Sequence, residues 1–383
     1  MLLCVAGASA QRSAGPATSA TPDGTAFFDQ LHGAYQSGNF SVLSLRLRTA
    51  GDCARLEPAL GSSTDQLTQV WKRENAAFLL DLADAITACP NQSFWKLLSA
   101  GRNYVIERPA APVKPGGKRP PAPFGVDVND DAFELLWHKV AVALLLREGA
   151  TTAADVYLDT LERRYQTGPA AKLAHTTLDA RFFLMRGMVA DLLVRSGPGA
   201  ARGSGSAPLP QFVAAAALAP EPDVQPATNL FASAVKAFEQ AATTDTTGSI
   251  APEAYVRLAA LHLKAGKPTD ALAALERAKM PTPDLSLAYW YGLWKGRILD
   301  ALNRQADAVV AYQQALDVSP TGQAAGVGLA LSLFKQNHRD EAAEAAARVR
   351  NISPTAPDPW WAYSRGDARF IEDWLADLRK AMR

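Results

Sequence analysis

Two helices and the turn between them can be read directly from residues 255–283, YVRLAALHLKAGKPTDALAALERAKMPTP. Ala271, Leu275 and Ala278 are spaced by four and three residues, so they share one face of a helix. Gly266 stands just before this helix, where its tolerance of a left-handed backbone ends the preceding one. A proline then stops the second helix. The stretch therefore predicts a helix, a tight turn and a second helix.

The same arrangement recurs along the second half of the chain. The alanines equivalent to Ala271 are Ala234, Ala308 and Ala342, and the four are separated by 37, 37 and 34 residues. The residues equivalent to Leu275 are Phe238, Tyr312 and Ala346. Small residues precede the last three alanines at the same distance, at Ala259, Gly296 and Ala330. In-phase repetition of this kind is typical of a stack of helix pairs, in which small residues let neighbouring helices approach closely.

This pattern resembles the tetratricopeptide repeat (TPR), which has about 34 residues per unit and small, aromatic and proline residues at these places. The resemblance covers residues 228–354. It implies an all-α fold, namely a right-handed α-solenoid of stacked helix-turn-helix repeats that ends in a C-terminal capping helix. An exported bacterial TPR protein fits the sequence best.

The chain divides into five predicted segments. They are a leader and spacer (1–25), a degenerate helical region (26–107), a basic Pro-rich linker (108–128), the helical array (129–354) and the capping helix (355–383). A Gly-, Pro- and Ala-rich insertion at 196–227 lengthens the loop between the two helices of one unit. The last segment carries an apolar stripe that suits a helix covering the open face of the last unit.

The first residues indicate export. Residues 1–11, MLLCVAGASAQ, form a short apolar run that ends in small residues, as at the cleavage site of a secretory signal peptide. The positive residues expected before such a run are missing, which a true start upstream of Met1 would explain; an ordinary N-terminal tail is the alternative. We therefore expect a periplasmic or cell-envelope protein. In such a compartment Cys53 and Cys89 could form a disulfide, or they could remain two buried thiols.

Composition and motifs exclude several functional classes. The 39 Lys and Arg against 38 Asp and Glu leave a net charge of +1, without the basic excess of a nucleic-acid-binding protein. No uncharged apolar run reaches the ~18 residues of a transmembrane helix. No phosphate-binding loop or nucleophile motif occurs, so we expect no catalytic residue, cofactor or metal. Glu134 and His138 could pair on one helix, although a solvated surface contact is the simpler interpretation.

In TPR proteins the first helix of each pair lines a concave groove that receives peptides, so the resemblance implies a binding surface on these helices. Carried over by register, the groove residues here are Val256, Lys264, Trp290, Arg297, Val327, Leu331, Phe334 and Lys335. An apolar floor edged by cations suits a protein or peptide with apolar anchors and a carboxylate. Several of these residues could instead pack against the neighbouring unit.

The sequence thus favours a non-catalytic scaffold or adaptor that binds a protein or peptide partner. A glycan-binding protein is the main alternative, with Trp290 and Trp294, or Trp360 and Trp361, as a stacking platform. A hydrolytic enzyme with a helical fold would need carboxylates that converge near His138. Exposure of the aromatic residues distinguishes the first two hypotheses.

Overall fold

The computed structural model describes residues 24–41, 43, 50–69, 73–86, 89, 91–105, 128–162, 178–200, 227–279, 284–353 and 355–381. Within these residues the chain is all-α and contains no strand, as the sequence predicts. No helix in this part of the chain is both long and apolar enough to cross a membrane. The predicted leader (1–25), linker (108–128) and insertion (196–227) lie almost entirely outside the described residues.

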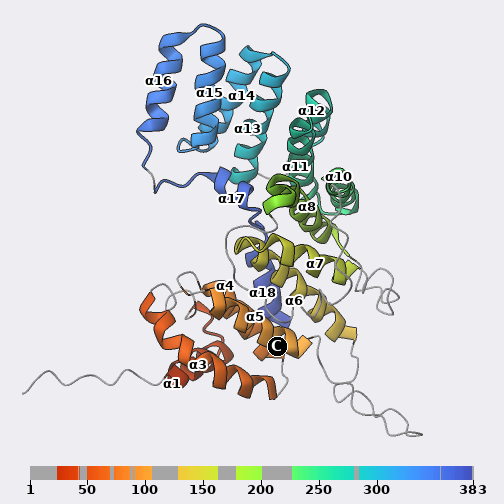
Figure 1. Cartoon of the computed structure of the whole chain (residues 1–383), viewed down its shortest axis with the longest axis vertical. Coiled ribbons are helices and arrows are strands. Elements are labelled where there is room, and N and C mark those ends of the chain that lie inside the picture. The colour runs from red at the N-terminus through yellow and green to blue at the C-terminus, as the bar shows by residue number, and fades with distance from the viewer. Residues whose placement is uncertain are drawn as a thin grey trace, which may run out of the picture.

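The helices form two groups at opposite ends of an elongated molecule (Figure 1). The N-terminal group is α1 (Gly24–Gln36), α3 (Ala50–Gln69), α4 (Arg73–Ala85), α5 (Asn91–Val105), α6 (Val128–Arg147) and α7 (Thr151–Glu162). The array is α8 (Ala180–Ala200), α10 (Ala227–Thr244), α11 (Ala251–Lys264), α12 (Pro268–Glu276), α13 (Leu285–Ala301), α14 (Gln305–Val318), α15 (Gln323–Lys335) and α16 (Arg339–Arg350). Two helices follow, α17 (Pro359–Arg365) and α18 (Ile371–Ala381).

Aromatic side chains fill the core of the N-terminal group. The rings of Phe28 and Phe78 meet edge to face at 5.5 Å, which joins α1 to α4. Trp137 of α6 is fully buried, and its Nε1 donates a hydrogen bond to the carbonyl oxygen of Ala76 at 3.2 Å. The indole thereby satisfies its donor while joining α6 to α4.

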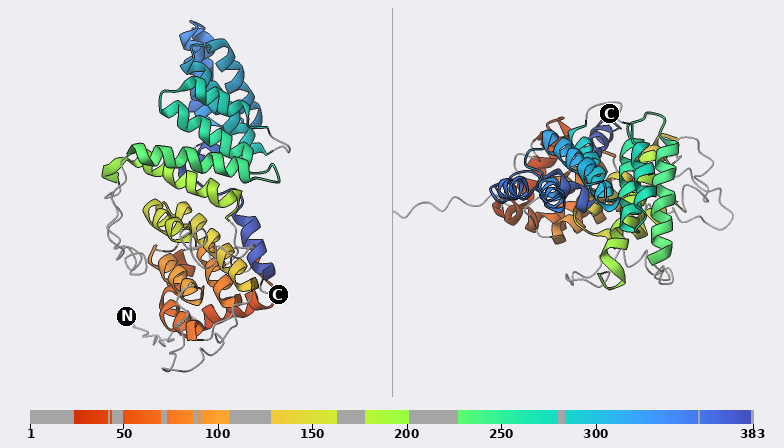
Figure 2. Two further views of the ribbon diagram at one scale, coloured as in Figure 1. Left: turned by 90° about the vertical axis from the view of Figure 1, so that its right-hand side faces the viewer. Right: turned by 90° about the horizontal axis from the view of Figure 1, so that it is seen from above.

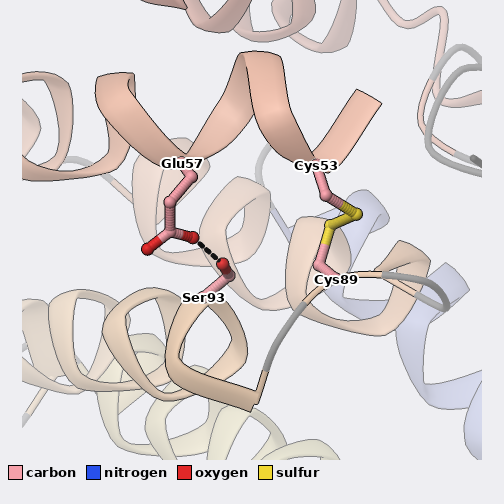
Figure 3. Close-up of a disulfide and its surroundings, with 4 residues drawn as sticks. All are labelled: Cys53, Glu57, Cys89 and Ser93. Atoms are coloured by element: carbon pink, nitrogen blue, oxygen red, sulfur yellow. Dashed lines mark hydrogen bonds between the residues drawn. A yellow bond between two sulfur atoms is a disulfide. The ribbon is translucent and has the colours of Figure 1, made fainter. Parts of the chain in front are cut away.

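A disulfide joins Cys53 of α3 to Cys89, which lies between α4 and α5 (Figure 3). Of the two alternatives that the sequence leaves open, the structure contains the disulfide. Beside it Ser93 of α5 donates a hydrogen bond to the Glu57 carboxylate of α3. This hydrogen bond lowers the pKa of Glu57 and holds α3 against α5. The disulfide holds α3 to the segment just before α5.

The array consists of four helix pairs: α8–α10, α11–α12, α13–α14 and α15–α16. A Cβ atom added to Gly296 of α13 would lie 2.6 Å from the Tyr312 ring of α14. In the first pair a Cβ atom on Gly187 of α8 would lie 2.5 Å from the Phe238 ring of α10. The two contacts are equivalent, so α8 and α10 form a pair despite the residues inserted between them.

The turns within the later pairs fall where the sequence predicts them. Gly266, Asn303 and Asn337 have φ angles of +72°, +59° and +66°, which is the left-handed region. Glycine enters this region without steric cost, and asparagine is among the residues that tolerate it best. These residues end the first helix of each pair and start the second.

The C-terminal helices do not cap the last unit, which corrects the prediction for residues 355–383. Instead α17 lies against α13, and α18 packs on α4 and α6 of the N-terminal group. The left view of Figure 2 shows the C-terminal helix beside the N-terminal helices, at the far end of the molecule from α16. There the Arg379 guanidinium donates two hydrogen bonds of 2.6 Å to the carboxylate of Asp81. The segment therefore ties the array to the N-terminal group.

Removing the disulfide should destabilise the N-terminal group. Its two cysteines are 36 residues apart, and closing such a loop is worth about 4 kcal/mol in the chain-entropy model. The double variant Cys53→Ser, Cys89→Ser should lose a free energy of unfolding of that order, measured by urea denaturation. Dithiothreitol should lower the midpoint of the wild type and leave that of the variant unchanged. Alkylation of both cysteines in denatured, unreduced protein would contradict the disulfide.

Asp84 should make the stability of the protein fall between pH 4 and 6. Burial raises the pKa of its carboxyl to about 6, against the opposing pull of Arg147, with which it is paired. The folded protein then holds a proton that the unfolded chain releases, so stability decreases as the pH rises through this window. We expect Asp84→Asn to gain on the order of 2–3 kcal/mol relative to wild type from pH 4 to pH 7. A constant difference across this range, measured by urea unfolding, would refute this expectation.

Candidate functional site

The surface predicted as a groove is partly filled by the chain itself. Helix α17 lies against α13, and the Nε1 of Trp290 donates a hydrogen bond to the Pro359 carbonyl oxygen at 2.8 Å. The Trp290 ring also meets the buried Tyr363 ring at 5.4 Å. Just before α17, the Thr321 hydroxyl donates to the Pro357 carbonyl oxygen at 2.6 Å. This segment of the chain thus occupies the place that the sequence assigns to a partner peptide.

A buried ionic cluster fixes the chain beyond α17. The Glu253 carboxylate of α11 is fully buried and accepts hydrogen bonds from the Nε of Arg257 at 2.8 Å and the Nε of Arg369 at 2.7 Å. Arg369 also pairs with Asp284 at the start of α13. Burial alone would raise the pKa of Glu253, but the two guanidinium groups outweigh it and lower that pKa. The carboxylate therefore stays charged where it contacts the two arginines.

A second ionic group joins α8, α11 and α17. Asp191 of α8 is buried and pairs with Arg195 and with the Nζ of Lys264, the latter at 2.9 Å. Arg195 also donates to the Ser364 carbonyl oxygen of α17 at 3.2 Å. The predicted groove residue Lys264 is therefore paired with an internal carboxylate, while its side chain remains 32% exposed.

Two further groove residues were predicted wrongly. Val256 and Trp290 are both 0% exposed, so neither contributes surface to a groove. Arg297 is half-buried, and its guanidinium lies 4.5 Å from the centre of the Trp360 ring and 4.9 Å from that of Trp294. Its cation–π contacts hold α17. Helical register gives the face of a helix, whereas Trp290 and Arg297 contact Pro359 and Trp360 of a segment more than 60 positions away in sequence.

The remaining predicted groove residues lie on α15, and their side chains are exposed to solvent. Val327, Leu331 and Phe334 are 57%, 50% and 60% exposed. Their spacing of four and three residues places them on one face of α15. Lys335 follows them and lies 3.6 Å from the Asp300 carboxylate of α13, with its side chain partly exposed. We call Val327, Leu331 and Phe334 the α15 stripe.

The aromatic platform of the glycan hypothesis is absent from this surface. Trp294 is buried with Trp290, and the Trp360 ring stacks on the Tyr363 ring at 5.4 Å. Trp361 is the one member of the two proposed pairs that is exposed, at 55%. A single exposed indole is not a pair of parallel stacking faces, and the other three tryptophans, Trp290, Trp294 and Trp360, serve packing.

The sequence analysis also considered Glu134 and His138 as a pair on one helix and expected a solvated surface contact. His138 is fully buried, not on a solvated surface, and its Nδ1 lies 2.6 Å from the Tyr157 hydroxyl of α7. The side chain of Glu134 is outside the described part of the structure. Within the described residues no three His, Cys, Asp or Glu side chains gather where they could hold a metal ion.

The sequence analysis named Trp360 but did not predict that this segment fills the groove, and it did not single out Tyr363 or Arg369. Trp360 and Tyr363 of α17 face the array, and Arg369 carries the ionic contact. The one available signal was the density of proline and aromatic residues between Pro357 and Tyr363. That signal indicates a packed segment but does not identify the surface that receives it.

Comparison with known families matches residues 210–336 to the tetratricopeptide repeat-like domain. The match spans α10 to α15 and overlaps most of the region that resembles this repeat in sequence. A search of curated proteins finds no match.

The docking of α17 should depend on Tyr363. Removing its fully buried ring in Tyr363→Ala should lower the free energy of unfolding by about 3–5 kcal/mol, as for other buried aromatic residues. Trp361→Ala, on the same helix, is the matched control and should change it by no more than about 0.5 kcal/mol. Urea denaturation of both variants checks the prediction, and equal losses would show that Tyr363 is not the anchor.

Proposed function

Because the protein contains a tetratricopeptide repeat-like domain, we propose that it is a non-catalytic scaffold that binds another protein through the α15 stripe. The observation that carries this proposal is the exposure of three large apolar side chains on one helix face. Solvated proteins rarely leave such a group uncovered, and contiguous apolar patches mark interaction sites. Helical repeats of this class present such surfaces to protein partners.

The proposed binding chemistry follows from the side chains of the surface. Leu331 and Phe334 supply apolar anchor points, and Lys335 at the end of α15 supplies a positive charge at the edge. Apolar anchors ringed by polar groups carry most of the binding energy of protein interfaces. A partner with a matching apolar face is therefore favoured over a soluble sugar, which would need exposed stacking faces.

We further propose that the protein acts outside the cytoplasm, in the cell envelope. The Cys53–Cys89 disulfide supports this location, because structural disulfides persist in oxidising compartments and are rare in the reducing cytosol. The small-residue run near the N-terminus points the same way.

Capture of partners from a cell-envelope extract tests the proposed function. Wild-type protein should recover at least one partner that Leu331→Glu recovers at least about tenfold less, because a carboxylate would be buried in the interface. Val310→Glu is the matched control, since Val310 of α14 is 54% exposed but lies outside the α15 stripe. Equal recovery of every partner by all three proteins would refute the α15 stripe as the binding surface.

A further inference from the structure

A cavity lies between the last three helices of the array, α14, α15 and α16, at the outer end of the molecule (Figure 1). Its volume is about 470 Å³, which is within the range of sites that enclose small organic ligands. Buried Leu329 of α15 lines it, together with half-buried Leu316 of α14, Val349 of α16 and Ile352. No residue of the α15 stripe lines it, so the cavity is a separate feature of this end of the array.

A single residue of α16 explains why the cavity is there. In the preceding pair, a Cβ atom added to Gly292 of α13 would lie 3.0 Å from the Cβ atom of Ala315 and 3.1 Å from its backbone nitrogen, so α13 and α14 are in close contact. Gly326 and Val349 lie 34 residues beyond Gly292 and Ala315 and take their places in the last pair. Outside α15, the only described atoms within 4 Å of a Cβ atom on Gly326 belong to the Val349 side chain, the nearest at 2.4 Å. The valine therefore separates the backbones of α15 and α16, which leaves room for the cavity.

A carboxylate at the cavity has no cation beside it. Asp317 is exposed in the last turn of α14 and forms no ion pair with any described residue, while the Gln313 amide donates a hydrogen bond to its Oδ1 at 3.0 Å. That turn carries no basic residue, although the negative end of the helix dipole favours a cation there. The other charged residue that lines the cavity is Arg348, which is paired with Glu344 at 2.9 Å. The cavity thus combines apolar walls with one uncompensated negative charge.

We propose that this cavity binds a small organic cation with an apolar body and a primary ammonium group, such as an arylalkylamine. The apolar body contacts Leu316, Leu329 and Val349, and the ammonium group lies beside the Asp317 carboxylate. Burial of the apolar body supplies most of the affinity, and the charge selects the amine over neutral and anionic compounds of the same shape. This inference goes beyond the proposed function, because it gives the array a small ligand at a site of its own.

Isothermal titration calorimetry of the full-length chain with three probes of the same shape tests the site. The probes are 2-phenylethylamine, 2-phenylethanol and phenylacetate, which differ in charge at one end. The amine should bind with a millimolar or tighter Kd, and the alcohol and the acid should bind at least about threefold more weakly, as expected for one exposed charge at a helix end. Equal affinity for all three probes, or no binding of the amine at about 10 mM, would overturn the proposal.

Substitutions of Asp317 test whether the amine binds in this cavity. Asp317→Asn removes the charge at nearly constant shape and should abolish the preference for the amine, whereas Asp317→Lys should make phenylacetate bind more tightly than 2-phenylethylamine. Because Asp317 is exposed, both variants should keep the wild-type midpoint of urea unfolding. Glu276→Gln is the matched control and should bind as wild type does, since Glu276 is an exposed carboxylate of α12 that does not line the cavity. A wild-type preference in both Asp317 variants would place the amine elsewhere on the protein and so refute the site.

Discussion

The buried carboxylate of Glu253 holds the molecule together. It accepts hydrogen bonds from Arg257 on its own helix and from Arg369 far along the chain. Removing either arginine would leave part of a fully buried charge without compensation, which is among the costliest defects in a protein interior. Because Arg369 also reaches Asp284, this one interaction fixes α11, α13 and the C-terminal segment relative to one another.

The array itself follows from local sequence, because its contacts join residues close together in the chain. Gly296 and the Tyr312 ring that packs against it belong to one helix pair. Glycine or asparagine at each turn shows where the first helix of a pair ends. Even the pair α8–α10 was predictable, since Gly187 and Phe238 repeat the same contact across a long insertion. Short-range periodicity is enough to predict such a fold.

The surface that we propose for binding was only half predictable from the sequence, for a physical reason. Periodicity shows that Val256, Leu293 and Val327 occupy the same place in successive units, yet it cannot show that two are buried and one is exposed. Burial depends on what packs over a residue, and α17 reaches α13 across a separation of 69 residues between Trp290 and Pro359. The spacing of residues within a repeat cannot predict a contact between segments so far apart in sequence.

The contact between Asp81 and Arg379 has a consequence for how the chain matures. The two residues are 298 positions apart, so the N-terminal group must wait for nearly the whole chain before α18 can pack on it. Until then, the apolar surfaces of α4 and α6 that contact α18 remain exposed to solvent. The surface of α13 that contacts α17 remains exposed as well. Contacts of such long range form late in folding, so these apolar surfaces are covered only after the last helices have been made.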